Sequence, residues 1–323
     1  MTKKIVIKLL KKAILLILPV YLLWFLYVEY MPMYYNSPNN TRWYFIKKYL
    51  EKEYVIPKSD FVFLGESRVN AGINFTKIPN SYSFASGGAS SIEMYYILKK
   101  HLKNYSKPKK IFLSISPRFL SEIFAFYPYF IRNKLISFSE MQEICSNLES
   151  SDKTLGKAPM RKFLLNKFNY LIYYQNDVKE NNVFGAYDTN QKMIDEMIKR
   201  RGGRFHPNLK KISSEFNEET KYKHFKPSKI ITTYLDKIFN LCKEKNIDIE
   251  FFFMPMNESS YNSLNLDFCK EYKSYMRNFQ KKYPEFLISD SIYFYNDGFF
   301  GDASHLNKKG KEKFTKCFLK NKF

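Results

Sequence analysis

Cysteine and histidine are scarce in this 323-residue sequence, which contains four of each. The cysteines include no Cys-x-x-Cys pair, and no histidine lies at zinc-ligand spacing from Cys145, Cys242, Cys269 or Cys317. We therefore expect no metal centre, and no cofactor is expected either. Cysteines scattered in this way are compatible with one or two disulfides in an extracytoplasmic domain, although buried free thiols are their more common state.

Acidic residues are also few: 31 Asp and Glu stand against 53 Lys and Arg, which gives a formal net charge of +22. Such a surface attracts polyanions, which include nucleic acid, anionic lipid head groups and phosphate-rich polymers. An AT-rich genome, which favours lysine codons, would produce the same excess without any polyanionic partner. No recognised nucleic-acid-binding motif is present, so nucleic acid is not expected as a partner.

Internal repeats and low-complexity tracts are absent from the sequence, which argues against a solenoid or array fold. Hydrophobic residues make up 45% and aromatic residues 18% of the chain, so it has enough apolar surface to fold. A chain of this length has room for one large domain or two small ones, and nothing in the sequence requires the second.

Small residues are missing from the exit of the long apolar run at 13–28, which reads V-E-Y-M-P-M-Y-Y. Because a signal peptidase needs small residues, an uncleaved transmembrane anchor is favoured over a cleaved signal peptide. Five lysines precede the run and only Glu29 follows closely, which predicts a cytoplasmic amino terminus and an outward-facing remainder. We divide the chain into a cytoplasmic tip and anchor (1–30), a linker (31–58) and a globular domain (59–323).

Short apolar runs alternate with amphipathic stretches in the globular part, a pattern typical of α/β proteins. Buried parallel strands are predicted at 61–65, 111–115, 247–255 and 286–288. Helices are predicted at 91–102, 228–244 and 266–282, and another at the end of the chain, after residue 307. Strand, helix and strand in succession imply a parallel sheet. We expect a three-layer α/β sandwich with a central parallel sheet, on which the irregular residues 120–225 form an inserted cap.

Ligands bind beyond the carboxyl ends of parallel strands, and two glycine-containing turns belong there. Ser67 follows the first strand and its Gly65, in a sharp turn that can project the hydroxyl, although a helix cap is the commoner role of such a serine. Gly87 and Gly88 precede a helix, where they either present a backbone N–H to a developing oxyanion or simply form the helix entry.

A third turn, G-D-A-S-H-L-N at 301–307, precedes the final predicted helix. Asp302 and His305 are three residues apart, so the carboxylate can hold the Nδ1 proton of the imidazole and leave Nε2 for Ser67. A lone Asp-x-x-His is often a coincidence, and the order of all three turns along the chain is what gives this one weight.

Together these blocks resemble the SGNH or GDSL hydrolase superfamily. The resemblance implies a flavodoxin-like α/β fold in which Ser67 is the nucleophile, Asp302 and His305 complete the triad, and the amides of Ser67, Gly87 and Gly88 form the oxyanion hole. F-L-G-E-S-R, I-S-P-R-F at 115–119 and F-G-D-A-S-H-L-N-K-K-G look like the membrane-anchored branch of that superfamily. That branch includes the D-alanine transfer protein of teichoic-acid D-alanylation and the alginate acetylation factors, which work beside membrane-bound O-acyltransferases.

Two positions depart from the superfamily pattern. Glu66 stands where Asp is usual, and the region after the second strand carries Ser114 and Ser116 in place of a G-x-N-D block. The sequence therefore offers no third oxyanion donor. Four residues are candidates for substrate binding: Arg68, Ser116, Arg118 and His206. For Arg68 a structural ion pair is favoured over a contact with an anionic group of the substrate.

The hypothesis is serine-dependent acyl transfer, or ester or thioester hydrolysis, on an envelope polysaccharide or a teichoic-acid-type polymer. Its expected partners are a membrane-bound O-acyltransferase and an anionic polymer or lipid surface. The alternative is a catalytically degenerate assembly partner of that acyltransferase, which would use the positive charge without the triad. Surface roles are expected for His101 and His224, which lie in lysine-rich sequence.

Overall fold

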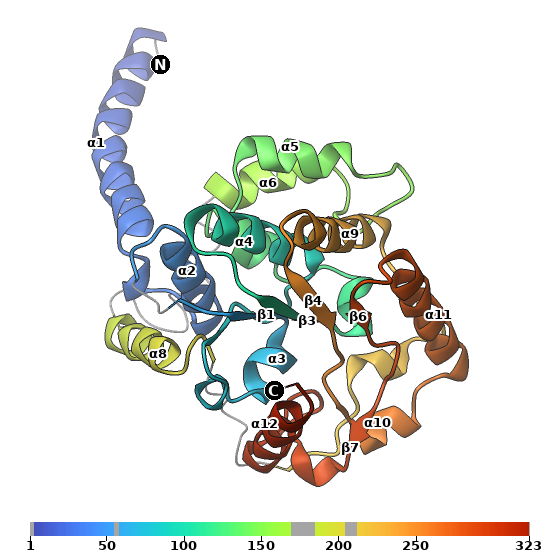
Figure 1. Cartoon of the computed structure of the whole chain (residues 1–323). Helices are drawn as coiled ribbons and strands as arrows, with labels where there is room; N and C mark the ends of the chain where they lie inside the picture. Colours follow the sequence, from blue (N-terminus) through green and yellow to red (C-terminus); the bar gives the residue numbers. More distant parts are fainter. Residues whose placement is uncertain (1–2, 55–57, 169–184, 204–211, 323) are drawn as a thin grey trace.

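The computed structural model describes residues 3–54, 58–168, 185–203 and 212–322 (Figure 1). Five strands form one parallel sheet in the order β2-β1-β3-β4-β6, and β5 pairs with β7 separately. The strands are β1 (Phe61–Gly65), β2 (Ser81–Ser83), β3 (Lys110–Ser114), β4 (Asp248–Phe251), β5 (Met256–Asn257), β6 (Leu287–Ile288) and β7 (Phe294–Tyr295). The described helices are α1 (Lys3–Tyr30), α2 (Pro38–Leu50), α3 (Ser67–Gly72), α4 (Ser91–Asn104), α5 (Phe138–Ser146), α6 (Pro159–Phe168), α8 (Tyr187–Lys199), α9 (Lys229–Glu244), α10 (Glu258–Asn262), α11 (Leu266–Lys282) and α12 (Lys308–Lys322).

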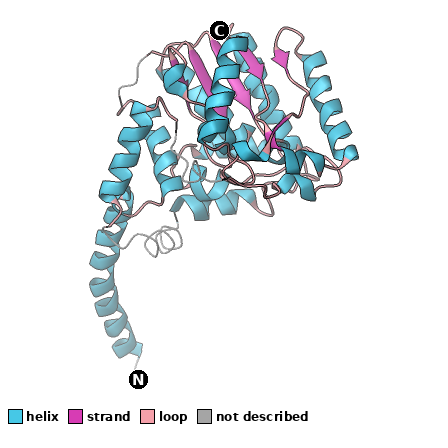
Figure 2. Ribbon diagram, turned by 90° about the horizontal axis from the view of Figure 1, so that it is seen from below, coloured by secondary structure: helices cyan, strands magenta, loops and turns pink. Residues whose placement is uncertain are grey.

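Both faces of the sheet are buried, and the strand sequences explain why. Successive side chains of a strand point to opposite faces. In β1, Val62 and Leu64 join the apolar cluster that contains α4 and α9, whereas Phe63 joins a second cluster that contains residues of α12. Figure 2 shows the strands side by side within the body, flanked by helices. The expected α/β class with a central parallel sheet is confirmed, since continuous apolar runs are what a sheet buried on both faces requires.

The strand boundaries differ from the sequence-based ones in two places. β2, which reads S-Y-S, was not predicted because three residues with two serines carry no hydrophobic pattern. The predicted strand at 247–255 ends at Phe251, and the chain then leaves the sheet and reaches the separate pair β5 and β7. Starting from β1, the chain adds β2 on one side and β3 on the other. This reversal opens a crevice at the carboxyl ends of β1 and β3.

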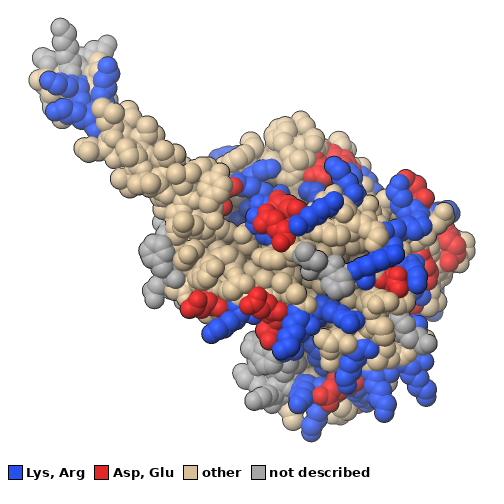
Figure 3. All heavy atoms as spheres, turned by 60° about the vertical axis from the view of Figure 1, so that its left-hand side comes forward, with Lys and Arg blue, Asp and Glu red and all other residues tan. Residues whose placement is uncertain are grey.

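Helix α1 is long and apolar enough over Ile5–Tyr30 to cross a bilayer. Its apolar side chains face outward, and Leu15 and Leu16 are 71% and 74% exposed. Figure 3 shows the lysines gathered at its far tip and an uncharged stretch between that tip and the body. The expectation of one apolar amino-terminal helix of membrane-spanning length is therefore met.

The linker expected at 31–58 is wrong at 38–50, because α2 is part of the folded body. Trp43 and Ile46 of this helix lie in the main core with almost no exposure. The buried Arg42 donates from Nη2 to the carbonyl oxygens of Ser83, the last residue of β2, and of Ala85, two residues later. The apolar spacing at 43, 46, 49 and 50 is helical, and it was obscured by the lysines and asparagines around it.

The described parts of 120–225, the segment expected to form an inserted cap, pack into the body of the protein. Phe126, Phe130, Phe163 and Met197 belong to the same main core as the sheet. The backbone N–H of Ser83 in β2 donates to the carbonyl oxygen of Arg201, which ties the segment to the sheet edge. The described parts of the insertion thus complete the body of the protein, and Phe124 and Tyr129 of this segment line the pocket at the crevice.

All four cysteines are free thiols. Cys242 is buried in the main core and Cys317 is exposed, while the other two are partly buried. Burial raises the pKa of the Cys242 thiol to about 12, so this thiol stays protonated and unreactive at neutral pH.

His101 is not on the surface, contrary to the expectation from its lysine-rich neighbourhood. Only 4% of the residue is exposed, because the ring packs against Tyr49 of α2, Tyr105 just after α4, and Phe84. Its Nδ1 lies 3.2 Å from the hydroxyl oxygen of Tyr49. Burial lowers the pKa of His101 from 6.5 to about 4, so the ring is neutral at neutral pH. His224, in contrast, is exposed and pairs with Glu271.

The substitution His101→Gln should make stability less sensitive to acid. Below pH 6.5 the unfolded chain binds a proton at His101, whereas the folded chain does so only near pH 4. This residue therefore costs the wild-type protein about 3 kcal/mol as the pH falls through that window. Urea titrations at several pH values measure this effect. As the pH falls from 6.5 to about 4, the unfolding free energy of the variant should rise by that amount relative to the unfolding free energy of wild type.

The comparison must use the difference between variant and wild type, because Glu93 acts in the opposite direction. Burial raises the pKa of Glu93 to about 7, so its contribution to stability grows as the pH falls toward its ordinary 4.5. A difference between the two proteins that does not change with pH would contradict a neutral, buried His101.

Candidate active site

Ser67 is the first residue of α3, directly after β1. The side chain of Glu66 caps this helix by accepting the backbone N–H of Arg68 at 2.8 Å. Gly65 is required at the end of the strand, because an added Cβ would lie 2.5 Å from Cγ2 of Val69 and 2.8 Å from the carbonyl oxygen of Ser114. The glycine therefore lets the strand turn sharply into the helix against β3, which places Ser67 at the rim of the sheet.

Asp302 and His305 lie in a closed loop before α12. An antiparallel bridge between Phe300 and Leu306 closes the loop. Oδ1 of Asp302 accepts the backbone N–H groups of Ser304 and His305, which fixes the carboxylate. Gly310 allows α12 to begin beside the loop, because a Cβ at that position would lie 2.2 Å from the carbonyl oxygen of Phe299.

The three side chains meet as the sequence predicts. Nε2 of His305 lies 2.8 Å from Oγ of Ser67, and Nδ1 lies 2.9 Å from each carboxylate oxygen of Asp302. A carboxylate only accepts hydrogen bonds, so Nδ1 carries the proton toward Asp302. In the neutral ring Nε2 is then an acceptor aimed at the serine hydroxyl, which is the arrangement that a general base needs.

The hydroxyl of Ser67 has a second acceptor within reach, Oε2 of Glu66 at 3.1 Å. One hydroxyl proton serves one acceptor at a time. With a neutral His305 the proton points to Nε2, whereas a protonated His305 donates to Oγ and turns the hydroxyl toward Glu66. Burial raises the pKa of the Glu66 carboxyl, although the neighbouring Arg68 opposes this effect. Glu66 therefore caps the first turn of α3 and offers the hydroxyl of Ser67 a second hydrogen-bond acceptor.

Gly87 and Gly88 lie beside Ser67. A Cβ added to Gly87 would be 4.0 Å from Cβ of Ser67, so the backbone passes next to the serine. Gly88 has a φ of +70°, and a Cβ there would lie 2.5 Å from the ring of Phe124. Within the described part of the chain, no backbone carbonyl accepts the N–H of Gly87. It is therefore placed to donate to an oxygen bound between the two segments.

Asn70 also borders the site, one helical turn after Ser67. It lines the same pocket as Ser67 and His305 and is 4% exposed. Its Oδ1 is buried without a hydrogen-bond partner among the described residues. A buried carboxamide that is left unsatisfied costs stability, and in a pocket such a group is suited to a bound molecule. Sequence reasoning missed this residue, although its spacing of three from Ser67 on a helix was the available signal.

The pocket around Ser67 has a volume of about 270 Å³. The aromatic rings of Phe119, Phe124 and Tyr129 line it, and among the described residues the only Lys, Arg, Asp or Glu in its lining is Arg118, which pairs with Glu122 at 3.3 Å. Its remaining walls come from Asn39, Asn70, Ala71, Gly87 and Gly88. An apolar wall beside a single cation suits a small acyl group on a molecule that is neutral or anionic.

The candidates for substrate binding separate in the structure. Arg118 lines the pocket, whereas Ser116 is buried outside the pocket lining. Arg68 does not line it either: its Nη2 donates to both carboxylate oxygens of Glu219, at 2.7 and 2.8 Å. The structural ion pair is therefore the correct interpretation of Arg68. His206 lies outside the described residues.

Glu219 is the residue that sequence reasoning had no means to find. It lies in a short turn of 3-10 helix (Glu218–Lys221), 151 positions after Arg68, and is fully buried. Burial disfavours the charge of Arg68, but Glu219 and Glu66 outweigh this effect and raise its pKa.

No model of a known protein family matches this chain, and no curated protein matches it either.

Proposed function

We propose that this chain is a serine-dependent acyltransferase or esterase of the SGNH kind, with Ser67 as nucleophile, His305 as general base and Asp302 as the residue that orients His305. The observation that carries the proposal is the 2.8 Å contact between Ser67 and His305 across 238 positions of sequence. The order of the five parallel strands agrees with a flavodoxin-like, three-layer α/β sandwich.

The reaction has two steps. Oγ of Ser67 attacks the acyl carbon of an ester or thioester while its proton passes to Nε2 of His305. His305 returns that proton to the leaving alcohol or thiol as its bond to the acyl carbon breaks. Water or an acceptor hydroxyl then attacks the acyl-serine while its proton passes to His305, and His305 gives that proton to Oγ of Ser67 as the bond between Oγ and the acyl carbon breaks. The backbone N–H groups near Ser67 and Gly87 and the Nδ2 group of Asn70, which donates where its Oδ1 can only accept, would stabilise the oxyanion.

We place the body of the protein outside the cytoplasmic membrane, with α1 as its single anchor. The lysines at the tip of α1 support this orientation. The acceptor is an envelope polysaccharide or teichoic-acid-type polymer, and the partner is a membrane-bound O-acyltransferase. Arg118 at the pocket and the net charge of +22 support a polyanionic acceptor.

Labelling of the full-length chain by a fluorophosphonate tests the proposal. The adduct should map to the peptide that contains Ser67, and Ser67→Ala should remove it. Ser121→Ala, another serine beside the pocket loops, should label as wild type does. Labelling that survives Ser67→Ala would refute the assignment. If the Ser67→Ala chain also restored polymer acylation in a deletion strain, the assembly-partner alternative would replace it.

Substitution of Asn70 by alanine should reduce kcat for hydrolysis of a small activated ester by about 10²-fold and leave KM nearly unchanged. The reason is that an oxyanion donor acts in the transition state more than in the ground state. Asn70→Asp keeps the shape but offers only acceptors when ionised, so it should lose at least as much. A variant Asn70→Asp with wild-type kcat would exclude an oxyanion role.

A further inference from the structure

Helix α6 is apolar on both of its sides. On the inner side, Phe163 is fully buried in the main core. On the outer side, Leu164, Leu165 and Phe168 are 41%, 48% and 57% exposed. Residues three and four apart lie on one face of a helix, so Phe168 lies beside both leucines. A surface helix normally turns a polar face outward, so the outer face of α6 is suited to an apolar partner.

A side chain of the adjoining helix extends this face. Phe138, the first residue of α5, is 49% exposed, and its ring centroid lies 6.3 Å from that of Phe163. We call Phe138, Leu164, Leu165 and Phe168 the α5–α6 apolar surface. Single exposed leucines need no explanation, whereas apolar side chains gathered on two adjoining helices mark an interaction surface.

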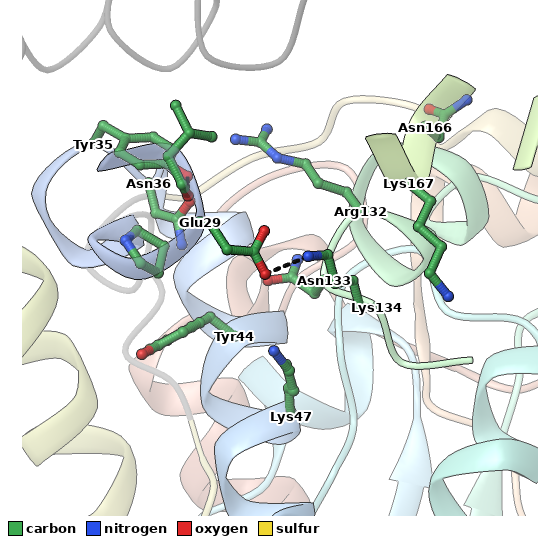
Figure 4. Close-up of a pocket in the computed structure, with 12 residues that line it drawn as sticks. Glu29, Tyr35, Asn36, Tyr44, Lys47, Arg132, Asn133, Lys134, Asn166 and Lys167 are labelled. Carbon is green, nitrogen blue, oxygen red and sulfur yellow. Dashed lines mark hydrogen bonds and ion pairs between the residues drawn. The ribbon is translucent and has the colours of Figure 1, made fainter. Parts of the chain in front are cut away.

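The end of α1 is fixed to the body next to α6. Val28 in the last turn of α1 is 5% exposed, and Glu29 pairs with Lys134. Val28 and Glu29 line one pocket together with Asn166 and Lys167 of α6. Figure 4 shows Asn166 and Lys167 across this pocket from Glu29. The carboxyl ends of α1 and α6 are therefore neighbours in the folded chain.

The length of α1 determines where this junction lies in a bilayer. The uninterrupted apolar stretch starts after Lys12 and α1 ends at Tyr30, so the stretch is about 27 Å long at about 1.5 Å per residue. The hydrocarbon core of a bilayer is about 30 Å thick. A helix that barely spans this core keeps the residues at its end, and whatever packs against them, at the membrane interface. With α1 across the membrane, the end of α6 therefore lies at the depth of the head groups and upper acyl chains.

The direction of α1 agrees with this placement. In Figure 1, α1 extends away from the body on the side that carries α5 and α6, whereas α12 lies on the opposite side. A membrane crossed by α1 would thus meet the α5–α6 side of the body. Arg161, which is exposed one helical turn before Leu165, has a side chain long enough to reach lipid head groups from this face.

We propose that the α5–α6 apolar surface inserts into the interfacial region of the bilayer beside α1 and gives the body a second contact with the membrane. Its occupant is lipid, namely glycerol backbones and upper acyl chains, and the contact does not depend on the charge of the head group. The inference rests on the part of the proposed function that places α1 across the membrane, and it does not require Ser67 to be a nucleophile. An interfacial helix lies in the membrane plane, so this contact would hold the body in one orientation.

Photolabelling in liposomes tests the contact. The full-length chain is reconstituted in phosphatidylcholine with a minority of a phosphatidylcholine that carries a diazirine near the glycerol end of one acyl chain. After irradiation and trypsin digestion, mass spectrometry locates the lipid adducts. We expect adducts in α1, in the peptide 163–167 and at Phe138. Leu266 is 74% exposed on α11, away from α1 in Figure 1, and should carry none.

A double variant makes the test specific. Leu164→Gln with Leu165→Gln should lower the adduct yield at Phe138 about tenfold relative to the yield in α1, because two apolar contacts with lipid are lost. Phe138 is unchanged in this variant, so its labelling reports the contact of the surface with lipid. Leu266→Gln with Leu287→Gln makes the same change at exposed leucines elsewhere and should label as wild type does. Denaturant unfolding of both variants should match wild type, since no buried side chain is altered.

Three results would overturn the proposal. The first is labelling of α1 without labelling of 163–167 and Phe138, which would leave this surface to a protein partner. The second is equal labelling of Leu266, which would mean that lipid contacts the body without selection. The third is a yield at Phe138 that the double variant leaves unchanged. Absence of adducts from α1 as well would reject the anchor together with this contact, whereas fluorophosphonate labelling of Ser67 would still report separately on the proposed chemistry.

Discussion

Replacing His305 by alanine is expected to lower kcat for ester hydrolysis by about 10⁶-fold, close to the loss that follows removal of the nucleophile itself. The reason is geometric: Nε2 of His305 is 2.8 Å from Oγ of Ser67, and no other imidazole of the described residues lines that pocket. Without a base the hydroxyl of Ser67 keeps its proton and is a poor nucleophile at neutral pH. Steady-state hydrolysis of a small activated ester measures the effect.

Controls separate this role from a general loss of structure. Asp302→Asn should reduce kcat by about 10⁴-fold, because the ring then loses the acceptor that keeps Nδ1 protonated. His224→Ala, which changes an exposed histidine, should leave kcat unchanged. The double variant of Ser67 and His305 should be no worse than either single one, since the residues act as a unit. Substantial activity in His305→Ala would exclude the proposed base.

The substitution Glu219→Gln should destabilise the protein by about 3 to 5 kcal/mol, the usual cost of leaving one member of a buried ion pair without its counter-charge. Both residues of the pair are buried, and Glu219 accepts two hydrogen bonds from one Nη2 of Arg68. Glu66 would remain near the guanidinium, 3.9 Å from its Nε, with no hydrogen bond formed. Denaturant unfolding of the two proteins measures the change.

A neighbouring residue supplies the matched control. Glu218→Gln removes an exposed carboxylate that pairs with Lys221, and it should leave the unfolding free energy nearly unchanged. Arg68→Lys should not restore the stability of the pair, because an ammonium group cannot reproduce the guanidinium geometry. If Glu219→Gln unfolded like wild type, the ion pair would be unimportant for the fold.

The parts of the site that the sequence predicted are those in which a local pattern carries the chemistry. Ser67 follows an apolar strand and a glycine, and Asp302 and His305 share one short turn. Each block is recognisable by itself, and the parallel topology brings them to one edge. The strands β1 and β3 were found for the same reason, since five consecutive apolar or small residues leave few alternatives.

The missed parts depend on contacts between distant residues. Glu219 lies in irregular sequence, and only the folded chain places it against Arg68. The sequence of α2 was interpreted as a linker because the polar residues around Trp43 and Ile46 interrupt the apolar pattern. These two side chains are buried by contacts with the sheet and with η4 (Phe126–Ile131), which are distant in sequence. His101 was misplaced for the same reason: its lysine neighbours face water while its ring faces Tyr49. Local patterns carry no information on such tertiary partners.

The proposed nucleophile lies at the start of α3, just after the first strand of the chain, whereas its proposed base lies in the loop before α12, which packs against α3. Thr315 of α12 accepts the backbone N–H of Asn74, just after α3, and so fastens the late segment to the early one. In a growing polypeptide, Ser67 therefore lacks its proposed base until the segment that carries Asp302 and His305 has been made. The proposed triad assembles only when that late segment docks onto α3, after α1 has left the ribosome.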